Sequence, residues 1–159
     1  MTMQQRGFLQ RQVNMARYML LGTVIITVIN LALLLAQADV YIVYSASVPY
    51  YLGWFGWVMD GYAVGQMTRI GMLLAAAVLA VYLLVWFLEG GRSVWLKVGL
   101  GLLIADTVLL LALVLWMDAS ILAFFWEFAL HGAVIYELVM GISAQKKLDA
   151  LAQEEIPVE

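Results

Sequence analysis

The sequence predicts an all-α fold, a polytopic four-helix transmembrane bundle with an aromatic segment between its first two helices. Hydrophobic residues make up 65% of the 159 residues and charged residues only 12%, whereas ordinary globular proteins hold roughly 45–50% and about 25%. A water-soluble fold of this size has too much surface to cover with so few charges. Four apolar stretches are also long enough to cross a bilayer core of about 30 Å, which takes about 20 helical residues.

The predicted membrane domain covers residues 18–147, with spans at 18–38, 67–88, 94–117 and 120–142. Residues 1–17 mix apolar residues with arginines and glutamines, which predicts an amphipathic cytoplasmic segment at the membrane surface. Residues 148–159 form an acidic tail that we expect to fray. Ala36-Gln37-Ala38 resembles a signal-peptidase site, but the preceding apolar run of about 18 residues is longer than a usual secretory core of about 7–15, so a retained helix is expected.

The segment 40–59 is apolar but does not predict a fifth span. It is rich in tyrosine and tryptophan, which favour the boundary between lipid and water. Pro49 would break the backbone hydrogen bonding that lipid demands of a spanning helix. We therefore expect this segment to lie in the interface or to re-enter the bundle.

The basic residues favour four spans and one orientation. With four spans, seven basic residues lie on one side of the membrane: Arg6, Arg11, Arg17, Arg92, Lys97, Lys146 and Lys147. Only Arg69 then lies on the other side. The positive-inside rule assigns the basic side to the cytoplasm, so we predict a multi-pass protein of the cell (cytoplasmic) membrane with both termini cytoplasmic.

Polar residues inside the predicted spans are the candidate site. Asp106 lies about 18 Å from the start of its helix and His131 about 17 Å into the next, which runs in the opposite direction. Both therefore fall near the midplane, with Asn30 at a similar depth and Glu127 one turn away. Tyr82 lies on the small-and-polar face of the second span. We expect an Asp106–His131 pair, because an unpaired charge at the bilayer centre costs at least about 2.5–3.5 kcal/mol.

These residues leave three functions open. The leading hypothesis is a small binding or transport bundle, as a homodimer, whose polar pocket holds a cation, a proton or a polar ligand. The alternative is a non-catalytic accessory subunit in a hetero-complex with another membrane protein, in which the polar residues bridge helices. The third is a metal-dependent membrane enzyme using Asp106, Glu127 and His131, a ligand set that metals accept.

Several chemistries have no support in the sequence. With no cysteine and one histidine, the chain offers no thiolate ligand and no bis-histidine haem site. The net charge of -3 comes without a dense basic patch, so nucleic acid is not an expected partner. The sequence identifies no cofactor, and the bilayer is the one partner it predicts directly.

A short motif carries a resemblance. The stretch Tyr44 to Tyr51 (YSASVPYY), placed directly after the first span, and the ending from His131 to Gly141 followed by lysines resemble small four-span bacterial membrane proteins with no assigned activity. The resemblance implies a prokaryotic cytoplasmic membrane and no particular chemistry.

Overall fold

The computed structural model describes residues 3–43, 45–88 and 93–154, so Tyr44, Arg92 and residues 155–159 of the predicted tail lie outside the described residues. The described residues are helical, without strands. The elements in chain order are α1 (Met3–Leu35), α2 (Ser47–Met59), the π-helical turn η1 (Asp60–Val64), α3 (Met67–Leu88), α4 (Ser93–Trp116), the 3-10 turn η2 (Ile121–Phe124) and α5 (Phe125–Glu154). Four helices are long and apolar enough to cross a membrane, namely α1, α3, α4 and the helix of residues 121–153. The predicted all-α four-span fold is therefore confirmed.

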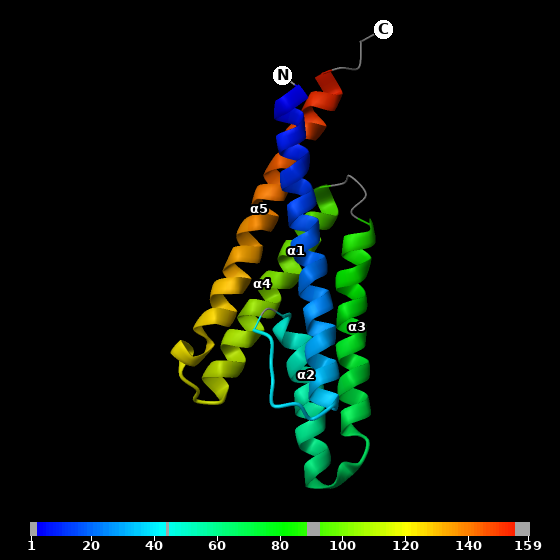
Figure 1. Cartoon of the computed structure of the whole chain (residues 1–159), viewed down its shortest axis with the longest axis vertical. Helices are drawn as coiled ribbons and strands as arrows, with labels where there is room; N and C mark the ends of the chain where they lie inside the picture. The colour runs from blue at the N-terminus through cyan, green and yellow to red at the C-terminus, as the bar shows by residue number, and fades with distance from the viewer. Residues whose placement is uncertain (1–2, 44, 89–92, 155–159) are drawn as a thin grey trace.

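Helices α1 and α5 form a long antiparallel pair, and both ends of the chain lie at the same end of the molecule (Figure 1). At that end the two helices extend past α3 and α4 as a stalk. The expected surface segment 1–17 is the first half of the stalk rather than a separate helix, because α1 is continuous from Met3 to Leu35. Leu9, Val13 and Ala16 are buried against α5, so the buried face of the span continues into the stalk. Residues 148–154 of the expected frayed tail are helical, since α5 continues to Glu154.

Between α1 and α3 the chain re-enters the bundle. After α1 ends, the chain turns back and α2 begins at Ser47, whose backbone N–H is bonded to Asp106 of α4. Asp106 lies about 20 Å along a helix of about 36 Å, so α2 starts near the middle of the bundle and runs back toward the end opposite the termini. With 13 residues, α2 is about 20 Å long and cannot cross a bilayer. The aromatic segment takes the re-entrant form of the two that the sequence allowed.

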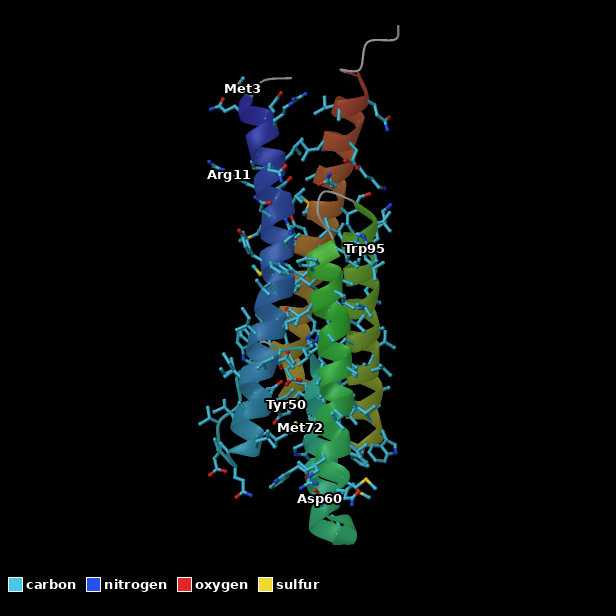
Figure 2. The ribbon with its side chains drawn as sticks, turned by 90° about the vertical axis from the view of Figure 1, so that its right-hand side faces the viewer. Met3, Arg11, Tyr50, Asp60, Met72 and Trp95 are labelled. Atoms are coloured by element: carbon cyan, nitrogen blue, oxygen red, sulfur yellow. The ribbon has the colours of Figure 1, made fainter. Side chains whose placement is uncertain are left out.

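Pro49 and two glycines explain how this helix fits. Pro49 is the third residue of α2, in the first turn, where an N–H would have no carbonyl partner within the helix. Gly56 of α2 faces Gly71 of α3, and a Cβ at either glycine would collide with the backbone of the other helix. The two helices can therefore approach closely. Figure 2 shows the result, with Tyr50 nearer to Asp60 than to Met3 and Asp60 at the end opposite Met3.

Candidate functional site

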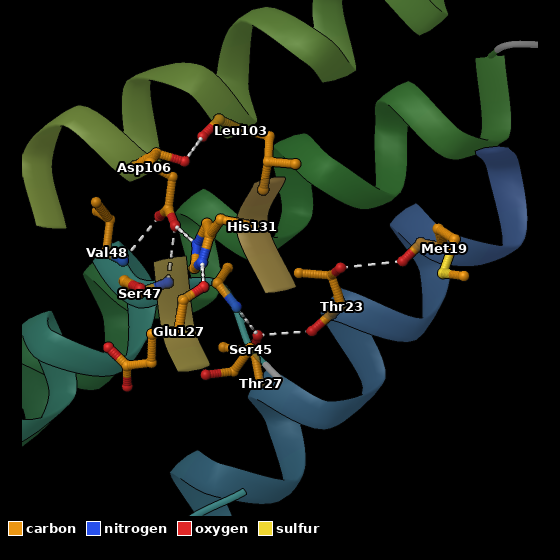
Figure 3. Close-up of polar contacts among 12 residues, drawn as sticks. Met19, Thr23, Thr27, Ser45, Ser47, Val48, Leu103, Asp106, Glu127 and His131 are labelled. Atoms are coloured by element: carbon orange, nitrogen blue, oxygen red, sulfur yellow. Dashed lines mark hydrogen bonds and ion pairs between the residues drawn. The ribbon is translucent and has the colours of Figure 1, made fainter. Parts of the chain in front are cut away.

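Asp106 caps the start of the re-entrant helix. Its side chain is 3% exposed, and its two oxygens accept the N–H groups of Ser47 and Val48, each at 2.8 Å (Figure 3). These are the first two residues of α2, whose N–H groups have no carbonyl partner inside the helix. The third residue, Pro49, has no N–H to satisfy. One carboxylate from α4 therefore satisfies the whole start of α2, at the end of the helix dipole that favours negative charge.

His131 completes this arrangement. Its Nε2 lies 2.9 Å from Asp106 Oδ2 and its Nδ1 lies 2.8 Å from the backbone oxygen of Glu127. A carbonyl oxygen only accepts, so Nδ1 carries a hydrogen. A second proton lies between Nε2 and the carboxylate, which makes the pair neutral overall whichever atom holds it. The structure thus brings together the two residues that the sequence paired.

The polar face of α1 serves the loop that leads into α2. Asn30 Nδ2 donates to the Ile42 oxygen at 2.7 Å, and the Ile42 N–H donates to Asn30 Oδ1 at 2.9 Å. Thr27 Oγ1 accepts the Ala46 N–H at 2.7 Å and donates to the Thr23 oxygen at 2.6 Å. Irregular backbone at membrane depth is tolerated only where such partners satisfy it. The contacts of Asn30 are therefore with the loop and not with Asp106.

The expectations for Tyr82 and for a metal site have different outcomes. Tyr82 is 1% exposed and packs in an apolar cluster with Leu20, Val24 and Leu79. Among the described residues, no three histidines or acidic residues gather in a way that could hold a metal. The three-residue set expected for a metal is not assembled, because the Glu127 side chain is directed away from His131 (Figure 3).

Glu127 bonds Tyr41 through its side chain, but one of its carboxyl oxygens has no hydrogen-bond partner among the described residues. Its side chain is 6% exposed, and its Oε2 is buried without a hydrogen-bond partner. Tyr41 lies beside it, with its hydroxyl 3.0 Å from Ser45 Oγ. The ring of Tyr41 contacts that of Tyr50, which in turn contacts that of Tyr51. A carboxylate surrounded by phenols can accept hydrogen bonds and attract positive charge.

The three tyrosines form a connected group. The ring centroids of Tyr41 and Tyr50 are 4.7 Å apart, and those of Tyr50 and Tyr51 are 5.4 Å apart. The sequence suggested an interfacial role for these residues, since tyrosine is common at that depth. Their place around Glu127 depends on the path of the re-entrant loop, for which the sequence carries no signal.

A groove opens beside this group. It lies between α2 and α4, has a volume of about 390 Å³, and is lined by apolar side chains together with Ser47, Tyr51, Trp54 and Trp116. Ser47 is 1% exposed, and its Oγ has no hydrogen-bond partner. Next to His131 there is also a cavity of about 10 Å³, which is about the size of one water molecule.

Four apolar helices and a re-entrant segment define the class as a multi-pass helical membrane protein. No protein-family model, curated protein or solved structure matches the chain.

Proposed function

We propose that the protein is a membrane-embedded binding protein for a small cationic ligand, with Glu127 as its counter-charge. The observation that carries the proposal is the buried, unpartnered Oε2 of Glu127. Buried polar atoms are nearly always hydrogen-bonded, and an unpaired carboxylate in the membrane is costly. A cation that enters from the end opposite the termini would supply the missing partner.

Glu127 and Asp106 differ in how their carboxyl oxygens are bonded, and this difference indicates which of them would bind the ligand. Asp106 accepts two backbone N–H groups and pairs with His131, so its bonding capacity is taken up by the fold. Glu127 holds no helix in place. We therefore assign ligand binding to Glu127 and give Asp106, His131 and Asn30 the task of positioning the re-entrant segment.

The surroundings of Glu127 favour a cation over other ligands. Tyr41, which lies beside Glu127, forms ring contacts with Tyr50, and Tyr50 with Tyr51, and aromatic rings attract ammonium groups. The basic residues of the stalk and of the α3–α4 connection support a cytoplasmic location of the termini by the positive-inside rule. Under that orientation the first turn of α5, which holds Glu127, lies toward the outer side of a cytoplasmic membrane.

Binding of butylammonium to the purified protein in nanodiscs of neutral lipid tests the proposal by calorimetry. The expected result is saturable binding that weakens about tenfold or more in Glu127→Gln, since a charge-assisted bond is worth about 1.5–3 kcal/mol. Glu137→Gln is the matched control, because Glu137 lies half-buried on the same helix, and it should bind like the wild type. Equal affinity in wild type and Glu127→Gln contradicts the proposal.

An accessory role is the second candidate, and one observation favours it. The end of α2 and the turn η1 carry exposed aromatic side chains, with Tyr62 79% exposed, Phe55 51% and Trp57 41%. Exposed aromatic residues are enriched at contacts between proteins. A stable complex with another membrane protein after mild detergent extraction, lost in the Trp57→Ser and Tyr62→Ser double variant, would support it. Butylammonium binding would be unaffected by that variant.

A further inference from the structure

We infer that the ligand is an amphiphile with an N–H-bearing ammonium head and an apolar chain, which binds with its head at Glu127 and Ser47 and its chain in the α2–α4 groove. The inference rests on the proposed function and names the ligand class for the same site. The site must then offer acceptors for a head with N–H donors, an apolar groove for the chain, and a continuous connection between the two.

The head is specified by two unpartnered atoms. Glu127 Oε2 and Ser47 Oγ are both buried without a hydrogen-bond partner in the part of the chain that the structure describes. The carboxylate only accepts, and the serine hydroxyl can accept as well as donate. A primary ammonium group has three N–H donors, enough in number for both atoms, whereas a quaternary ammonium group has none. The bond from the Ser47 backbone N–H to Asp106 fixes the position of this residue, so its hydroxyl is positioned to bond a ligand.

The chain is specified by the groove. Its walls are leucines of α4 facing the apolar and aromatic side chains of α2, and it ends at Trp116, the last residue of α4. Its volume of about 390 Å³ lies within the range of ligand pockets, about 300–1,000 Å³. Ser47 lies at the inner end, near the middle of the bundle, so the chain of a ligand anchored there runs outward.

Tyr51 connects the two parts. It lines the groove, and its ring contacts that of Tyr50, which contacts Tyr41 beside Glu127. Charge complementarity then decides the occupant. A phosphate or carboxylate head would be repelled by Glu127 and would bring only acceptors to Ser47. An ammonium amphiphile matches the charge, the donor count and the apolar walls together.

The head is tested with dodecylammonium and dodecyltrimethylammonium in neutral-lipid nanodiscs. Ser47→Ala should weaken dodecylammonium about fivefold, the value of one hydrogen bond, and leave dodecyltrimethylammonium unchanged. Ser47→Thr retains a hydroxyl and should restore most of the affinity. Both variants keep the backbone bond to Asp106, and their melting temperatures check the fold. Equal effects of Ser47→Ala on the two ligands would overturn the assignment of the head.

The chain is tested by fluorescence with dodecylammonium brominated near the end of its chain. Bromine quenches tryptophan on contact, so saturable quenching is expected in wild type, with a reduced amplitude in Trp116→Phe and Trp54→Phe. Glu127→Gln should abolish the saturable part. Saturable binding of butylammonium without any quenching by the brominated chain would overturn the groove while leaving the proposed function standing. Failure of butylammonium to bind, by contrast, removes the proposed function itself.

Discussion

Two carboxylates at neighbouring depths have opposite roles in this protein. Asp106 is surrounded by donors from α2 and α5, whereas Glu127 ends in a buried oxygen with no partner. A buried charge is costly unless it is paired and hydrogen-bonded. At the scale of single residues, the hydrogen bonds of each carboxylate distinguish a residue that stabilises the fold from a residue that is available to bind a ligand.

Asp106→Asn tests the structural half of this distinction. An amide offers one oxygen and two N–H groups in place of two acceptors, so one N–H of the α2 start would face another donor. We expect a loss of stability of about 2–5 kcal/mol, measured by unfolding in mixed micelles.

Asp118→Asn is the control for Asp106→Asn, because it makes the same change at an exposed position just beyond the end of α4. It should shift stability by no more than about 0.5 kcal/mol. Similar losses in the two variants would show that the cap of α2 contributes nothing special.

At the scale of elements, carboxylates cap the helices on both sides of the turn η1. Asp106 caps α2 from a neighbouring helix, and Asp60 caps α3 by accepting the Met67 and Thr68 N–H groups at 2.7 and 2.9 Å. Hydrogen bonds, with that of the Thr68 side chain the largest, hold the pKa of Asp60 below its ordinary value of 3.8. Asp60 is partly exposed to solvent, unlike the buried Asp106.

The lowered pKa of Asp60 predicts an acid-dependent cap. A carboxyl whose pKa is depressed by folding contributes stability in full above its ordinary value, and the contribution is lost as the pH falls through the depressed value. The difference in melting temperature between wild type and Asp60→Asn should therefore be constant near neutral pH and shrink below pH 3.8. It should also shrink at high salt, because an exposed charge is screened. A difference that is independent of pH would contradict the cap.

The elements differ in how far the sequence could predict them. Composition and length were sufficient for the four spans, and the aromatic residues with Pro49 were sufficient to exclude a fifth. The continuity of α1 through the stalk was missed, because Leu9 and Val13 lie among arginines and glutamines. Their burial depends on α5 lying beside them, which is a tertiary contact that local polarity does not report.

The candidate site shows the same limit. The Asp106–His131 pair could be predicted because both residues lie at a similar depth and an unpaired charge at that depth is energetically costly. The cap on α2 could not, since it depends on where a re-entrant loop returns to helix. The sequence singled out the tyrosines, but it could not predict that they lie beside Glu127, because this also depends on the path of the re-entrant loop.

At the scale of the whole molecule, the two ends of the bundle differ. The stalk end is a pair of helices with buried apolar contacts, whereas the re-entrant helix α2 runs to the opposite end (Figure 1). The groove lies between α2 and α4, and Glu127 lies in the first turn of α5. This asymmetry suits a protein that binds its ligand from one side. The site also depends on the depth at which α2 begins. If this segment crossed the membrane as a fifth span, neither the cap on α2 nor the groove would form.

The absence of cysteine allows this topology to be tested by single cysteines and a membrane-impermeant maleimide. Met3→Cys and Lys147→Cys should label from the same face, because both are exposed on the stalk, and Tyr62→Cys should label from the other face only. Val48→Cys should label from neither face until the protein is denatured, because α2 begins near the middle of the bundle. Labelling of Met3→Cys and Lys147→Cys from opposite faces would mean five spans and would contradict the fold on which the site depends.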